Sequence, residues 1–68
     1  MLDAEKLSIA IKQRGLTLSA LADNVGVNKS TFYRKLKNGG DNFLLWEIEA
    51  IVKILELTKI DAIEIFLP

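Results

Sequence analysis

The 68-residue chain contains no cysteine and no histidine. It can therefore form neither a disulfide nor a thiolate metal site, and it lacks both the commonest general base and the commonest metal ligand. Catalysis would have to rest on carboxylates, which are spread along the second half of the chain in the manner of a solvated face. The composition argues against an enzyme and predicts no metal and no cofactor.

Long apolar runs are also missing. Half of the residues are hydrophobic, which is enough for a core, but no run approaches the ~20 residues of a membrane span. The N-terminus lacks the basic stretch followed by an apolar one that marks a signal peptide. The length suits one domain, residues 1–68, near the lower limit for a core without cross-links. We therefore expect a soluble, cytoplasmic domain with no membrane partner and no small-molecule ligand.

The net charge is zero, with nine basic and nine acidic residues, and at first this speaks against a nucleic-acid partner. The charges are nevertheless unevenly distributed. Residues 28–40 hold four bases and no acid, a charge of +4, whereas residues 41–68 hold two bases and six acids, a charge of −4. A small DNA-binding protein needs positive potential only where it meets the DNA, and acids on the far face limit non-specific binding. The polarity favours DNA more than the zero sum opposes it.

The most specific pattern lies in residues 17–38. An amphipathic segment, 17–25, is followed by the turn Gly26-Val27-Asn28 and by a basic segment, 29–38. Gly26 suits a turn with positive φ, and Asn28 suits the N-cap of the second helix. Two helices joined by a tight glycine turn, the second one basic, are typical of a helix-turn-helix that lays its second helix in the DNA major groove. The alternative is a small helical bundle in which Gly26 only ends a helix.

Three further helices are predicted around this motif. The first runs from an N-cap at Asp3 to about Arg14, the fourth spans roughly Leu45 to Glu56, and the fifth follows a cap at Thr58 and continues through Phe66. Helical spacing predicts the inward-facing residues, which are Ala4, Leu7 and Ile11, then Leu18, Leu21, Ala22 and Val25, then Phe32 and Leu36, and finally Ile48, Ile51, Val52 and Leu55. No useful strand pattern occurs, so the expected fold is all-α with five helices.

Several short motifs occur in a characteristic order, namely Leu16-Thr17, Leu21-Ala22, Gly26-Val27, residues 30–36 and the segment 43–66. These motifs span essentially the whole chain. In them the chain resembles the lambda-repressor/Cro-like family of phage and bacterial regulators. The resemblance implies a compact five-helix DNA-binding domain whose second and third helices form the helix-turn-helix. Small single-domain members of this kind are typically Cro-type repressors or their antagonists in a lysis–lysogeny switch, so the resemblance also implies transcriptional control by operator binding.

The N-terminal part of the third helix enters the groove most deeply in this class of proteins. Arg34 can donate two hydrogen bonds to guanine, Asn28 can pair with adenine, and Lys29 can reach guanine as a single donor. The predicted base-contacting residues are Asn28, Lys29, Ser30, Tyr33 and Arg34. Simpler roles remain open: Asn28 as a cap alone, Arg34 on a phosphate or in solvent, and Tyr33 as a shield over Phe32.

DNA phosphates are predicted to meet the start of the second helix and the end of the third. The predicted phosphate-contacting residues are Thr17, Ser19, Thr31, Lys37 and Asn38. Many family members carry a glutamine just after the cap of the second helix, where its amide holds a phosphate, but this chain has Leu18 there. The contact then falls to hydroxyl groups and to the helix dipole. Lys35 lies off the groove-facing arc and is expected to be solvated.

The fourth and fifth helices carry more apolar residues than one core needs. Trp46, Ala50 and Ile54 recur at helical spacing on nearly the opposite side from the core stripe, and Ile65 fits neither face of the fifth helix. With Phe66, the stripe is the predicted interface of a weak homodimer. One recognition helix covers about one half-site, so two copies around a two-fold axis are expected at a palindromic operator. The alternative is that Trp46 folds under the loop at 39–43.

A second function remains open. A helix-turn-helix domain that no longer binds DNA could use the Trp46 stripe to hold a protein partner, as an anti-repressor or an antitoxin-like module does. The basic residues Lys29, Arg34 and Lys37 favour DNA, whereas the two apolar faces of the fourth helix fit both hypotheses.

Overall fold

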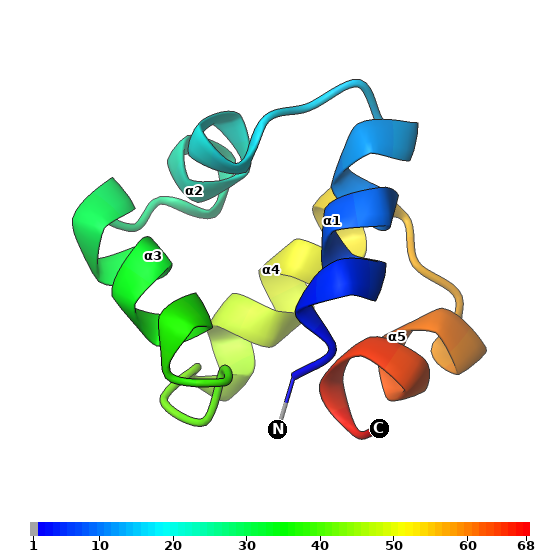
Figure 1. Ribbon diagram of the computed structural model, residues 1–68. Coiled ribbons are helices and arrows are strands. Elements are labelled where there is room, and N and C mark those ends of the chain that lie inside the picture. The colour runs from blue at the N-terminus through cyan, green and yellow to red at the C-terminus, as the bar shows by residue number, and fades with distance from the viewer. Residues whose placement is uncertain (1) are drawn as a thin grey trace.

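The computed structural model describes residues 2–68 and arranges them in five helices, with no strand among these residues (Figure 1). The helices are α1 (Ala4–Gln13), α2 (Leu18–Val25), α3 (Lys29–Lys37), α4 (Leu45–Leu55) and α5 (Lys59–Phe66). Their bounds lie within about one residue of those predicted from capping and periodicity. The prediction of an all-helical fold with five helices is confirmed.

Polar side chains cap the start of four of these helices. Asp3, Thr17, Asn28 and Thr58 each accept a hydrogen bond from a backbone N–H two or three residues later, over 2.9–3.2 Å. Each cap satisfies a donor that has no partner within the helix and contributes typically about 1 kcal/mol. α4 begins differently, because its N-cap residue, Leu44, has no side-chain acceptor. There the local sequence provides another solution, the Glu47 carboxylate, which accepts the Leu44 N–H over 2.8 Å.

The turn between α2 and α3 depends on Gly26. Its φ is 91°, in the left-handed region that a side chain disfavours, and its N–H donates to the Ala22 carbonyl group. No atom lies within 4 Å of the position that a Cβ would take, so the backbone conformation, not lack of space, requires glycine. Ala22 is completely buried, so a larger side chain would have to displace its neighbours. The chain thus turns from α2 into α3 within three residues.

α4 lies at the centre of the fold. Figure 1 shows it between the α2–α3 pair on one side and α5 on the other. The fully buried side chains of the neighbouring helices meet around it, and the residues with no exposed surface are Leu21 and Ala22 of α2, Phe32 of α3 and Ile51 of α4. α1 and α5 complete the core with Leu7, Ile11 and Ile65. Every helix therefore contributes at least one buried apolar residue to a single core.

The N-terminal residues join the loop after α3 to α5. The Leu2 N–H donates to the Gly39 carbonyl oxygen over 2.6 Å, and the Asp3 N–H donates to the Ile65 carbonyl oxygen over 2.7 Å. A Cβ on Gly40 would lie only 2.7 Å from the Leu2 Cβ, so glycine is required where the two segments cross. Leu2 and Asp3 are thus part of the folded unit.

Several predicted core positions need correction. Ala4 is exposed and Ala10 is buried in its place, because α1 turns the Leu7–Ala10–Ile11 side towards the core. Ile65, which fitted neither apolar face of the predicted fifth helix, is the buried residue of α5. Ala50 and Ile54 are half-buried and pack against the core, so they do not form a free second face with Trp46. Trp46 remains half exposed, which rules out its burial under the loop at 39–43.

Within residues 2–68, no helix has both the length and the hydrophobicity that crossing a bilayer would require.

Phe32→Ala tests how α3 is held on the core. Because Phe32 is the one buried side chain of α3, its truncation should lower the free energy of unfolding by ~3–5 kcal/mol, close to the whole stability of so small a domain. The exposed neighbour provides the control, since Tyr33→Ala should change the free energy of unfolding by less than about 0.5 kcal/mol. Thermal and urea unfolding followed by circular dichroism measure both. A cooperative Phe32→Ala melt near that of the wild type would contradict this role.

Candidate nucleic-acid interface

α3 buries one side and exposes the other. The Phe32 ring lies in the core and meets Phe43 edge-on, with ring centroids 5.4 Å apart. Leu36, one turn later, is half-buried against the same core. Four of the α3 residues predicted to contact bases or phosphates are exposed, and these are Ser30, Tyr33, Arg34 and Lys37. The helix therefore presents a continuous outer face rich in hydrogen-bond donors, while contact of that face with DNA stays a prediction.

Asn28 acts as the cap of α3. Its Oδ1 accepts hydrogen bonds from the Ser30 N–H and the Thr31 N–H over 2.9 and 3.2 Å. A two-bond contact with adenine needs the oxygen and the amide nitrogen together, so it would compete with the cap. The Asn28 amide NH₂ group, in an exposed side chain, still offers its hydrogen atoms to a base or a phosphate. Donation alone is the DNA contact that the observed cap permits.

The basic residues of α3 differ in what already neutralises them. Lys29 lies 3.5 Å from the Asp23 carboxylate, in a pair that is more than half exposed and therefore weak. Arg34 and Lys37 form no ion pair with any carboxylate in residues 2–68, and both are exposed. These two side chains are thus available to an anionic partner without first giving up an internal one.

The predicted phosphate-contacting residues lie at two helix ends. Thr17 caps α2 by accepting the Ala20 N–H over 3.0 Å, which leaves its hydroxyl hydrogen as a donor. Ser19, in the first turn of α2, and Thr31, in the first turn of α3, are half-buried. Lys37 and Asn38, at the end of α3, are exposed. The start of α2 and both ends of α3 thus carry hydroxyl, amide and ammonium donors.

Lys35 is not solvated, contrary to the prediction. Its Nζ lies 2.7 Å from Oε1 of Glu47, and the two side chains are only 18% and 3% exposed. The same ammonium group lies 5.8 Å from the centre of the Phe43 ring. The expectation that the acids of α4 and α5 form a solvated face is accordingly wrong for Glu47. Helical periodicity did not predict this pair, because it gives only the direction in which a side chain leaves the helix. Lys35 is next to the core-facing Leu36, and its long side chain can bend inward to reach Glu47, twelve residues later in the sequence.

Burial and hydrogen bonding act in opposite directions on Glu47. Burial raises the pKa of its carboxyl group, but hydrogen bonds from Lys35 and from the Leu44 N–H, with the charge of Lys35, outweigh burial and hold the pKa below its ordinary value. The carboxylate therefore joins three elements: α3 through Lys35, the loop at 38–44 through Leu44, and α4, which carries it. This triple contact fixes where α3 ends relative to α4.

A second exposed surface is apolar and lies between α4 and α5. The side chains of Leu45 and Leu67 are 73% and 75% exposed, and Ile63 is 54% exposed. They border a groove of about 270 Å³ whose lining includes Ile48, Ala62 and Phe66 but no charged residue. Of the four predicted interface residues, only Phe66 is among those that line this groove. Trp46 is exposed on α4 but does not line it, and neither do Ala50 and Ile54. The sequence does contain a sign that Leu45 is exposed at this surface, because Leu45 lies at the start of α4 and outside its core stripe.

The Lys35–Glu47 pair predicts how stability depends on pH. Since the pKa of Glu47 is lowered in the folded state, its contribution is complete above the ordinary carboxyl value of 4.5 and is lost as the pH falls through the lower folded pKa. Lys35→Met removes the compensating charge and should destabilise the protein at neutral pH by roughly 3–5 kcal/mol. This loss should shrink as the pH falls below 4.5, because protonation of Glu47 removes the buried charge that Lys35 no longer compensates.

Urea unfolding measured between pH 3 and pH 7 for the wild type, Lys35→Met and the exposed control Lys53→Met checks this expectation. An unchanged acid profile for Lys35→Met would show that the pair does not hold α3.

No group of three or more carboxylates within residues 2–68 is arranged to hold a metal ion. Comparison of the chain with protein-family models, with curated proteins and with solved structures finds no match. What the protein does is therefore inferred from its own geometry, in which the exposed basic face of α3 is the most specific feature.

Proposed function

We propose that the protein is a sequence-specific DNA-binding transcriptional regulator, with α2 and α3 as its helix-turn-helix. In this proposal it is a Cro-like repressor of the lambda-repressor/Cro-like class and acts in the cytoplasm of a bacterial or phage-infected cell. The observation that carries the proposal is the outer face of α3, where exposed Arg34 and Lys37 form no ion pair with any carboxylate of residues 2–68. Arginine and lysine in that state are the side chains that reach guanine edges and phosphates.

The sharp turn at Gly26 also supports this function. A helix can enter the major groove only if it projects beyond its neighbours, and α2 and α3 lie together on one side of the molecule (Figure 1). The N-terminal end of α3 carries exposed Asn28, Lys29 and Ser30, the positions that meet bases most often in such motifs. The start of α2 adds donors for the adjoining phosphates. Base contact and backbone contact would thus come from neighbouring parts of one surface.

The apolar groove between α4 and α5 supports a dimer. Its lining holds no charged residue, so two copies can meet there without opposing like charges, although the surrounding tail is acidic. The interface we propose is therefore Leu45, Ile63, Phe66 and Leu67, without Trp46, Ala50 and Ile54. A palindromic operator requires that the two α3 helices of the dimer lie about 34 Å apart, in successive major grooves. The small area implies a weak dimer that is completed on DNA.

The same surface supports a second candidate function, a module that binds a protein partner and no DNA. Exposed Leu45 and Leu67 favour that alternative as much as they favour a dimer. A mobility shift with random duplex DNA at two salt concentrations separates the two functions, since only the DNA-binding protein should retard the duplex, and less so at higher salt.

Arg34→Ala and Lys37→Ala should have different effects on DNA binding. On duplexes selected from a random pool, Arg34→Ala should cost about 1–3 kcal/mol of affinity, with a much smaller loss on random DNA. Lys37→Ala should weaken both equally and reduce the slope of log K against log salt by about one. The matched control is Lys53→Ala, at an exposed lysine of α4 that forms no ion pair within the described residues 2–68. Equal losses on both DNAs for Arg34→Ala would make it a phosphate contact.

Leu45→Glu should break the dimer while leaving the monomer folded. The side chain is largely exposed, so the substitution costs little in one copy but buries a carboxylate between two. Sedimentation should show no association, and the variant should bind a full palindrome no more tightly than a half-site. Ile9→Glu, an exposed apolar residue of α1, is the control. Undiminished affinity for the palindrome in Leu45→Glu would place the dimer contact elsewhere.

A further inference from the structure

A groove of about 680 Å³ runs between α1 and the α2–α3 pair. Its apolar lining comes from three segments and consists of Ala4, Leu7, Ile11, Leu16, Leu18 and Leu36. Ser8, Lys12, Thr17 and Lys37, all exposed, complete it at the surface. Neither the proposed DNA contacts nor the proposed dimer uses this apolar lining. It is large enough for a specific ligand, since binding sites typically measure about 300–1,000 Å³.

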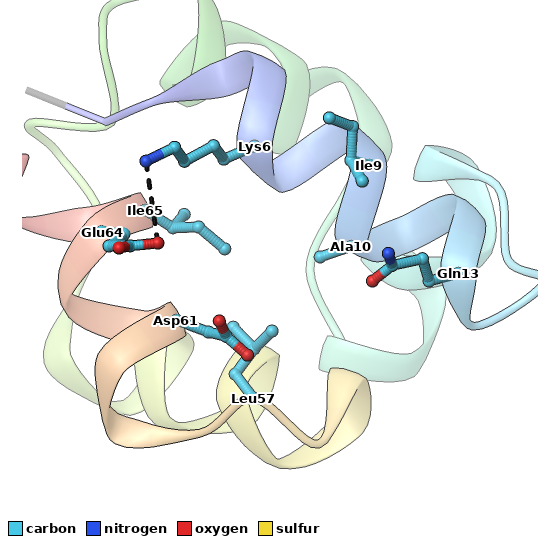
Figure 2. A pocket seen from close by; sticks show the side chains of 8 residues that line it. All are labelled: Lys6, Ile9, Ala10, Gln13, Leu57, Asp61, Glu64 and Ile65. Atoms are coloured by element: carbon cyan, nitrogen blue, oxygen red, sulfur yellow. Dashed lines mark ion pairs between the residues drawn. The ribbon is translucent and has the colours of Figure 1, made fainter.

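The charge of this groove is unbalanced. Lys12 and Lys37 are exposed, neither forms an ion pair within residues 2–68, and no acidic residue belongs to the lining. The cavity between α1 and α5 is different (Figure 2), since its Lys6 already faces Glu64 over 3.7 Å and Asp61 also lines it. The groove beside α2 and α3 therefore attracts an anionic ligand, whereas the cavity of Figure 2 holds its own counter-charge.

The shape favours a helical peptide. The α1 residues that line the groove recur as Ala4, Leu7, Ser8, Ile11 and Lys12, which is one stripe of a helix. At 1.5 Å per residue this stripe is about 12 Å long, or roughly two helical turns. A peptide helix of two turns would place apolar side chains at positions i, i+3 or i+4, and i+7 in the groove. The other side chains of the peptide would lie at the edges of the groove. Acidic side chains at those edges would meet Lys12 and Lys37.

We propose that this groove binds an acidic amphipathic helix of a partner protein, and that the bound helix excludes DNA. The second part rests on the proposed function, because Thr17 and Lys37 line the groove and are also proposed phosphate contacts. A partner that covers them removes a donor from each end of the DNA-binding surface. Its acidic side chains would also repel the approaching phosphates. The groove is thus a site at which a protein can switch off operator binding.

Selection of peptides tests the groove directly. A random library of peptides about 16 residues long, selected on the immobilised full chain, should yield sequences with apolar residues at helical spacing flanked by aspartate or glutamate. Fluorescence anisotropy with a labelled selected peptide should show a loss of about tenfold or more for Ser8→Trp, which fills the groove, and for Lys12→Glu, which reverses its charge. Ile9→Trp, on the adjacent face of α1, and Lys53→Glu are the matched controls and should bind normally.

Two results would overturn the groove as a peptide site. One is that the selected peptides are not acidic, or that they bind the Ser8→Trp variant as tightly as they bind the wild type. The other is binding of dodecanoate, but of no peptide, in a Ser8-dependent manner, which would assign the groove to a lipid carboxylate.

Competition tests the switch separately. A selected peptide should lower affinity for the operator duplex in the wild type and have no effect in Ser8→Trp, a variant outside the proposed DNA contacts. Simultaneous binding of peptide and duplex would overturn the switch and leave the peptide site standing. Absence of any duplex binding without peptide would overturn the proposed function and the switch together, while the direct peptide measurement would still decide the groove.

Discussion

α3 is attached to the rest of the molecule through one completely buried side chain, Phe32, and this attachment determines what the helix can offer. A helix that buried a wide apolar face would sit in the core and present little to a partner. With one aromatic anchor and the half-buried Leu36, α3 leaves most of its surface outside. The T-shaped contact of Phe32 with Phe43 then connects it to the loop that leads into α4. The narrow contact of α3 with the core through Phe32 thus both holds the helix in place and leaves most of its surface exposed.

The four basic residues in the segment 28–40 differ in how far a carboxylate of the protein neutralises them. Glu47 neutralises Lys35 inside the fold, and Asp23 partly neutralises Lys29 at the surface. Arg34 and Lys37 remain for an outside partner. A protein with zero net charge can therefore still attract an anion locally, because no carboxylate within residues 2–68 pairs with these two bases. For the proposed DNA partner, two such bases predict a modest non-specific attraction, and specificity would then come from shape and from base contacts.

The sequence predicted the helices well because each has a local signal: a capping residue, a helical apolar stripe, or glycine at a turn. Gly26 and Asn28 are clear examples, since a positive φ and a side-chain cap depend on the residue itself. The Lys35–Glu47 pair and the burial of Ile65 were not predictable in the same way. They arise where segments far apart in the sequence meet, and a helical wheel records the angle of a residue but not what lies opposite it. The interface residues Ala50 and Ile54 were misplaced for that reason, because a 68-residue chain wraps α4 on more than one side.

The central claim is that duplex DNA binds across α3 and the start of α2. Titration of ¹⁵N-labelled protein with an operator duplex selected from a random pool tests it most directly, since each backbone amide reports its own surroundings. The account predicts that the signals of residues 17–19 and 28–38 shift together and saturate at one protein per half-site, while those of residues 4–13 change little. Shifts confined to α4 and α5, or no shift at all at low salt, would contradict it.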